Sequence, residues 1–227
     1  MRFLILFVLV FIVACKKQED KVPDYIKVDK YAGLEKGRFI IYQAIEINHT
    51  PATSTTVISD TFRYELKVVI EDTLTDDLGR ISWKYLRYKR QNAQENWALS
   101  DVWTTLLAAE NLEIVEENQR IIKLKSPIKN STAWNENIYN NLGESVVSYE
   151  KINASFSLNS LSFDSTVTVN QGEERNLISF VKKQEVYAKG VGMVYKYFKD
   201  LKIANFDTLN IKSGKELYLY PKLVGFQ

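Results

Sequence analysis

The sequence predicts a mainly β protein whose single antiparallel sheet is strongly curved or forms an incomplete barrel, with a β-sandwich as the alternative. Apolar and polar residues alternate along several segments, and clusters of Asn, Asp and Ser separate these segments, as expected for strands linked by turns. An antiparallel meander can keep one face in water, but it must curl or close to protect its edges. The composition, 45% hydrophobic and 26% charged with one Cys, excludes collagen-like, disulfide-rich and polytopic membrane classes.

The clearest alternation runs through residues 62–71, where aromatic and aliphatic residues alternate with mostly charged ones. This pattern places an apolar stripe on one face of a strand. A turn cluster follows at 76–79, and the alternation resumes at 81–85. We expect a long hairpin with its tip at the start of that cluster, which would place Glu65 opposite the region of Arg87 and allow cross-strand charge pairs.

A second hairpin is predicted at 112–124, where residues 117–119 separate two apolar runs. Residues 97–110 fit two templates, and the helical one matches the apolar spacing better than the strand one. Further strand-like segments are 39–47, 155–158, 163–169, 185–188, 193–198 and 217–220.

The N-terminus has the features of an export signal. Arg2 precedes an unbroken apolar run of eleven residues at 3–13, and Ala14 and Cys15 follow. Eleven helical residues span about 16 Å, well short of the roughly 30 Å hydrocarbon core of a bilayer. A charged start, a short apolar middle and a small residue before the cut predict a secretory signal rather than a membrane-spanning helix.

Residues 12–15 (IVAC) resemble the lipobox of bacterial lipoproteins. The resemblance implies that the Cys15 thiol receives a diacylglyceryl group, that the chain is cut between Ala14 and Cys15, and that the new amino terminus is acylated with a fatty acid such as palmitate. An ordinary secretory signal with a chance Cys is the alternative. We therefore expect a cleaved signal peptide at 1–14, a lipidated Cys with a flexible tether at 15–30, and one β-rich domain at 31–227.

The residues directly after Cys15 indicate which membrane would hold the protein. An Asp directly after the lipidated Cys is the familiar signal for retention in the inner membrane, and Lys16 stands there instead. This favours the outer membrane, on its periplasmic or cell-surface face. The order of charges at 16–20 also resembles the surface-export signal of Bacteroidota lipoproteins, although Gln18 interrupts it; a plain solvated linker is the alternative.

A further resemblance is carried by segments spread over most of the exported domain. These are 37–42, 79–80, 87–90, Trp97, Trp103, 117–124, Pro127, Trp134, Asn135, Asn137, Tyr139, Asn140 and 187–194. They resemble an uncharacterised family of Bacteroidota outer-membrane lipoproteins, although Glu136 stands where that family usually has Gly. The resemblance favours a strand over a helix at 97–110 and brings no activity with it.

No motif in the sequence predicts catalysis. His49 is the only histidine and lies in a polar stretch, where a lone His is usually solvated, and no G-x-S-x-G elbow accompanies it. The sequence lacks a zinc motif and a phosphate-binding glycine loop, so we expect no metal and no cofactor. Because the net charge is only +2, we expect no nucleic-acid partner. We predict that the protein is not an enzyme.

Two kinds of surface site are candidates. Trp134, Asn135, Asn137 and Tyr139 form a candidate ligand-contact loop, because an aromatic plane beside amide groups suits sugars; a long turn pinned by one buried Trp is the alternative. Three Asp-Ser/Thr-apolar triplets resemble the O-glycosylation site of exported Bacteroidota proteins. Their acceptors are Thr73, Ser165 and Thr208.

The leading functional hypothesis is a lipid-anchored, non-enzymatic module that binds or scaffolds another envelope component, whether a protein, a glycan or a lipid. The alternative is a carrier that holds a lipid or acylated peptide in an open barrel. A carbohydrate-active enzyme is the third hypothesis, and it requires two carboxyl groups facing each other in a cleft. An apolar cavity of several hundred Å³ would favour the carrier, whereas a filled interior with an exposed aromatic patch would favour partner binding.

Overall fold

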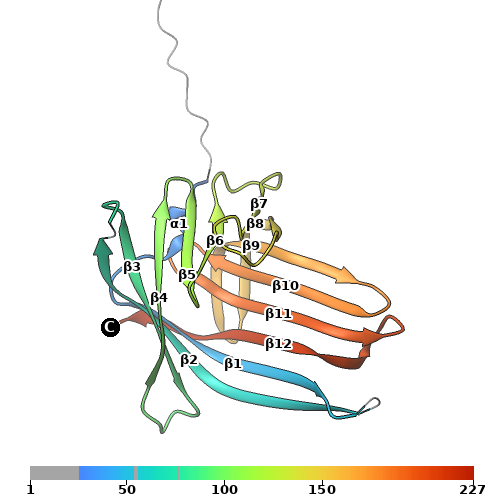
Figure 1. The fold of residues 1–227 in the computed structure, drawn as a ribbon. Coiled ribbons are helices and arrows are strands. Elements are labelled where there is room, and N and C mark those ends of the chain that lie inside the picture. Colours follow the sequence, from blue (N-terminus) through green and yellow to red (C-terminus); the bar gives the residue numbers. More distant parts are fainter. Residues whose placement is uncertain (1–25, 54–55, 76) are drawn as a thin grey trace, which may run out of the picture.

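A computed structural model describes residues 26–53, 56–75 and 77–227. These residues form one twelve-stranded antiparallel sheet that curls into an almost closed barrel (Figure 1). The predicted fold class, a single strongly curved antiparallel sheet or incomplete barrel, is confirmed. Within the described residues, no helix is both long enough and apolar enough to cross a bilayer.

One short helix precedes the strands. The elements are α1 (Asp29–Ala32), β1 (Arg38–Pro51), β2 (Val57–Thr75), β3 (Ile81–Arg90), β4 (Ala98–Ala108), β5 (Asn111–Glu116), β6 (Gln119–Lys125), β7 (Ala133–Asn135), β8 (Val146–Leu158), β9 (Leu161–Arg175), β10 (Ser179–Ala188), β11 (Gly192–Ala204) and β12 (Asp207–Phe226).

The strand order shows how the barrel is built. β1 to β6 form one meander and β7 to β12 form a second, and β1 pairs with β12 to join them. That pairing begins with Arg38 opposite Phe226 and continues to His49 opposite Gly214. Because every other neighbour in the sheet is also a neighbour in the chain, the only discontinuity among the described strands lies between β6 and β7. We call this discontinuity the seam.

Both predicted hairpins are present, with one correction of register. Glu65 lies opposite Arg90, not Arg87, and forms an ion pair with it in which Arg90 Nε donates to Glu65 Oε2 at 2.6 Å. The reason is that β2 continues to Thr75, which faces Ile81, so the turn falls later than expected; the bulge after Ile70 offsets this shift by one residue. Residues 98–108 form the strand β4, which settles the ambiguous segment in favour of the strand.

The seam is held mainly by side chains. One backbone bond crosses it, from Ile122 N to the Glu136 carbonyl at 2.9 Å. The indole Nε1 of Trp134 donates to the Ile122 carbonyl at 2.9 Å. The Tyr149 hydroxyl accepts from Lys125 N and donates to the Lys125 carbonyl, both at 2.7 Å. These groups satisfy backbone atoms that an edge strand would otherwise leave unpaired.

The short helix α1 lies at one end of the barrel (Figure 1). Val28, Tyr31 and Ala32 are buried in the main hydrophobic core with residues from β5 to β10. The Tyr31 hydroxyl donates to Asn153 Oδ1 at 2.7 Å. The packed part of the chain therefore includes Val28, which lies before residue 31, and α1 covers this end of the interior.

Gly33 ends α1 in a conformation that only glycine adopts easily. Its φ is +64°, and a Cβ built there would lie 2.1 Å from the Val191 carbonyl oxygen. At Gly79, φ is +73° but a Cβ would meet nothing within 4 Å. A side chain at either position would meet the backbone strain of a positive φ, but only at Gly33 would it also collide with a neighbouring backbone atom.

We expect Gly33→Ala to lower the free energy of unfolding by roughly 3 kcal/mol more than Gly79→Ala, because it adds overpacking to the strain. Urea unfolding followed by tyrosine and tryptophan fluorescence measures both. Equal losses of unfolding free energy in the two variants would mean that Gly33 is not packed closely against the β10–β11 turn.

Candidate ligand-binding cavity

The interior of the barrel contains a cavity of about 610 Å³. This volume lies within the range of small-molecule binding sites. Side chains of β1 to β6 and β10 to β12 line it, and Ala32 and Leu34 close it at the α1 end. The cavity is thus bounded by both meanders.

The lining changes from apolar to charged along the strands. On β1 the lining side chains run from Phe39 and Ile40 to Glu46, and on β5 from Leu112 to Glu116. Arg38, at the start of β1, also lines the cavity and is paired with Glu35 at 2.6 Å. The same direction is followed on β12, from Leu219 to Lys215. Since Leu112 packs in the same core cluster as α1, the apolar end is the end that α1 covers. The cavity is therefore amphipathic along its length.

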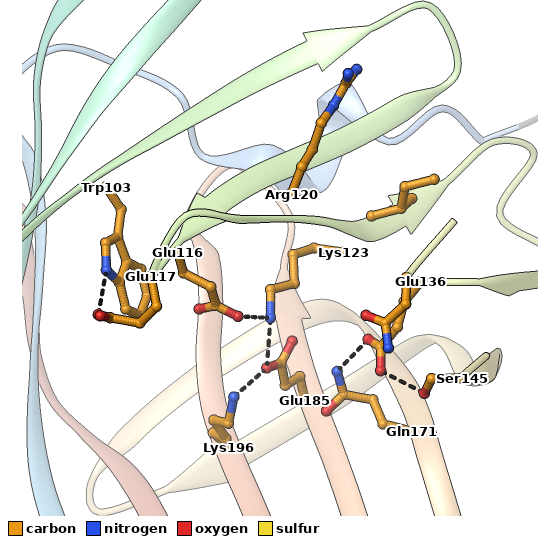
Figure 2. A network of polar contacts seen from close by, with 12 residues as sticks. Trp103, Glu116, Glu117, Arg120, Lys123, Glu136, Ser145, Gln171, Glu185 and Lys196 are labelled. Carbon is orange, nitrogen blue, oxygen red and sulfur yellow. Dashed lines mark hydrogen bonds and ion pairs between the residues drawn. The ribbon is translucent and has the colours of Figure 1, made fainter. Parts of the chain in front are cut away.

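Four charged side chains point toward one another inside the barrel (Figure 2). Lys123 of β6 lies between two carboxylates: its Nζ is 2.9 Å from Glu116 Oε1 and 3.7 Å from Glu185 Oε1. Lys196 Nζ lies 2.8 Å from the same oxygen of Glu185. We call these four residues the interior charge network. It connects β5 and β6 of the first meander to β10 and β11 of the second.

The network keeps its carboxylates ionised. Burial would raise the pKa of Glu185, which is 1% exposed, but Lys123, Lys196 and a hydrogen bond from Tyr187 lower that pKa to about 2. Burial would likewise raise the pKa of Glu116, but Lys123 and Lys196 lower that pKa below its ordinary value. The pKa of Lys123 is raised by Glu116 and Glu185 against the effect of burial.

This charge state bears on acid–base chemistry. Glu116 and Glu185 do face each other in a cavity, which is the arrangement that a glycosidase requires. The general acid of such a pair needs a raised pKa so that it carries a proton at neutral pH. Both carboxylates here have lowered pKa values. The arrangement is therefore suited to fixed charge and poorly suited to proton transfer.

The charged end of the cavity is rich in paired groups. Arg87 lies 3.2 Å from Asp101 and stacks on the Trp103 ring at 3.9 Å. Trp103 in turn lies parallel to Tyr85, with ring centroids 6.2 Å apart. These contacts hold the wall of the cavity in place and present polar atoms beside aromatic faces.

His49 is not in a solvated loop, contrary to the sequence-based expectation. It lies on β1, is 8% exposed, and bridges Ser59 Oγ at 2.7 Å and Glu216 Oε1 at 3.0 Å. Glu216 is also 2.9 Å from Lys199 Nζ. Because His49 is an odd number of positions from the cavity-lining Glu46, its side chain points to the opposite face of the sheet.

The sequence did not predict this Ser-His-Glu arrangement, because its three residues lie on three different strands. Ser59 is 10 residues and Glu216 is 167 residues from His49. None of the three residues lines the cavity. Lys199 and the Tyr218 hydroxyl also bind Glu216. The trio thus forms part of a polar network on the outside of the barrel that joins β2, β1, β12 and β11.

The candidate ligand-contact loop lies beside the seam. Trp134 is 4% exposed and packs on the Tyr149 ring at 4.8 Å, so its face is not available at the surface. Asn135 Oδ1 accepts from the backbone of Asn137 and Ser145. Tyr139 is 49% exposed, and the Arg120 guanidinium lies over one face of its ring at 4.3 Å. The burial of Trp134 corresponds to the alternative of a turn pinned by one Trp, and ligand contact through Tyr139 stays a prediction.

The other predicted sites have different surroundings. Thr73 is exposed, whereas Ser165 and Thr208 are half-buried. The Ser165 hydroxyl is within 3.0 Å of the Tyr31 hydroxyl, so a glycan there would disturb α1. Ala14 and Cys15 lie outside the described residues. Among the residues that are described, no cluster of three His, Cys, Asp or Glu could hold a metal ion.

Replacing Glu185 with Gln should lower the free energy of unfolding at pH 7 by roughly 3 kcal/mol, the value that corresponds to its pKa shift. A lowered folded-state pKa stabilises the fold above the unfolded pKa, and this contribution is lost as the pH falls from about 5 toward 2. The difference between wild type and Glu185→Gln should therefore shrink over that range.

Chemical denaturation at a series of pH values measures this difference. Glu173→Gln is the matched control, because Glu173 forms a solvent-exposed pair with Lys182 that is worth at most about 1 kcal/mol. A constant gap between wild type and Glu185→Gln from pH 7 to pH 2 would contradict the ionised state of Glu185.

A scan against protein-family models, a search of curated proteins and a search of solved structures each found no match to this chain. Its function must therefore be argued from its own residues.

Proposed function

We propose that this chain is a lipid-anchored, non-enzymatic envelope protein that carries an amphiphilic ligand inside its barrel. The observation that supports the proposal is the cavity of about 610 Å³ with an apolar end under α1 and a charged end opposite. A ligand with an apolar chain and a polar head would match both ends at once. The carrier role thereby ranks above the scaffolding role that the sequence favoured.

The length of the cavity suits an acyl chain with a polar head. The lining of β1 extends from Arg38 to Glu46, eight residue steps that cover about 26 Å in a strand. With C–C bonds of about 1.5 Å in a zigzag, an extended acyl chain of roughly sixteen carbons covers about 20 Å and leaves room for the head at the charged end. A single-chain lipid or the acyl chain of a modified peptide is thus the class of ligand that we propose.

The anchor and the location rest on the sequence. Cys15 is proposed to be acylated after cleavage at Ala14, and Lys16 favours the outer membrane. One lipid chain binds a bilayer only marginally, whereas two or three chains on one residue hold a protein stably. A tethered barrel of this kind would exchange its ligand with the membrane beside it or with another envelope protein.

Docking of an envelope protein is the second candidate function. It is favoured by apolar side chains in the loop after β7 and at the start of β8. Ile138, Leu142 and Val146 are 62%, 59% and 60% exposed, and Tyr139 lies among them. Leu142 also lines the cavity, so a partner bound at this loop would contact the wall that encloses the ligand.

Filling the cavity should weaken ligand binding. The chain from residue 16 onward keeps every described residue, and N-phenyl-1-naphthylamine is a neutral apolar probe whose fluorescence rises on burial. We expect Leu217→Trp, which enlarges a lining side chain, to raise the dissociation constant at least tenfold. Leu223→Trp is the control on the same strand, since Leu223 is 48% exposed and outside the lining. Equal affinities in wild type and Leu217→Trp would exclude the interior as the binding site.

Replacing Cys15 with Ser should prevent acylation and block cleavage after Ala14. Labelling cells with an alkyne analogue of palmitate is expected to mark the wild-type protein and leave the Cys15→Ser variant unmarked, and the variant should keep the higher mass of the unprocessed chain. Identical labelling and mass in the two proteins would refute the anchor without bearing on the cavity.

A further inference from the structure

We infer that the cavity selects single-chain amphiphiles whose polar head carries no net charge, either zwitterionic or uncharged. This inference rests on the proposed carrier function and concerns the ligand class that the same cavity would accept. It follows from how the charged side chains of the lining are paired.

The lining is electrically balanced. Six cationic and five anionic side chains line the cavity, and Glu35, which binds the lining residue Arg38 at 2.6 Å, supplies a sixth carboxylate. A charged head would therefore find no surplus of the opposite sign to neutralise it. An ion taken out of water without such a partner loses its hydration and gains little in return.

The pairs are also arranged locally, so that no part of the charged end has one sign. Glu46 Oε1 lies 2.8 Å from Lys215 Nζ, and Arg87 is paired with Asp101. Deeper in the cavity, Lys123 contacts Glu116 and Glu185. An anionic head could bind Lys123 or Lys215 only by displacing the carboxylate that already holds it, and that carboxylate would remain nearby. Two further lining charges, one of each sign, lie against aromatic groups: Lys89 Nζ is 5.3 Å from the Tyr64 ring, and Glu117 accepts from Trp103 Nε1 at 3.4 Å.

A head with no net charge avoids this exchange. The two ends of a zwitterion can lie alongside a pair such as Glu46 and Lys215 with each charge near its opposite, and an uncharged head can accept or donate hydrogen bonds without breaking a pair. The apolar lining toward α1 is the same for every head. Selection by the head should therefore appear among ligands with identical chains.

The experiment measures displacement of N-phenyl-1-naphthylamine from the chain beginning at residue 16 by four compounds with sixteen-carbon chains. These are lysophosphatidylcholine, monopalmitoylglycerol, lysophosphatidylglycerol and hexadecyltrimethylammonium, each below its critical micelle concentration. We expect the first two, whose heads have no net charge, to displace the probe at concentrations at least tenfold lower than the anionic or the cationic compound. Equal or tighter binding of either charged compound would overturn the inference while leaving the carrier function intact.

Two variants test the cause. Glu46→Gln should improve the affinity for lysophosphatidylglycerol at least fivefold, because it leaves Lys215 unpaired, and Lys215→Met should do the same for hexadecyltrimethylammonium. Glu173→Gln, on an exposed pair outside the cavity, should change neither. Failure of the two lining variants to shift the selection would also overturn the inference. If neither the probe nor any of the four compounds binds, the proposed function fails, and the inference fails with it.

Discussion

The barrel can retain a cavity because charged side chains occupy positions where a collapsed core would need apolar ones. Lys123, Glu116, Glu185 and Lys196 meet in the interior, and each carboxylate is held by a lysine from a neighbouring or facing strand. Removing Lys123 would leave Glu116 without its partner, and removing Glu185 would leave Lys196 without one; a buried charge left unpaired costs several kcal/mol. The two meanders are therefore held at a fixed separation, and the apolar space toward α1 is preserved between them.

The same constraint explains why the sheet closes as it does. Pairing of β1 with β12 joins the two meanders along a long ladder, and the opposite edges meet at the seam. There the contacts come mainly from Trp134 and Tyr149, whose side chains bind the backbone of β6. A seam made of side-chain contacts is less cooperative than a backbone ladder, so it is the place where this barrel can open at the lowest cost.

The predicted elements differ in how well the sequence specifies them. The alternation at 62–71 is a local pattern of period two, and β2 and the hairpin with β3 were predicted for that reason. The first half of β12 was missed, because its side chains have weak alternation and Leu209 is 89% exposed. That segment is a strand because β11 pairs with it. The α1 helix was also missed, since four residues give no periodicity, and packing of Tyr31 against Asn153 and Ser165 holds it.

The features of the candidate site likewise differ in whether the sequence could predict them. The sequence alone determined the fold class. It also predicts the anchor at Cys15 and contains no local catalytic motif. Each of these depends on residues that are adjacent or alternate along the chain. Only the tertiary structure decided the cavity, the interior charge network and the Ser59, His49 and Glu216 arrangement. Lys123 and Glu185 are 62 positions apart, and a charge pair of this kind forms only when strand order and curvature bring two distant strands face to face.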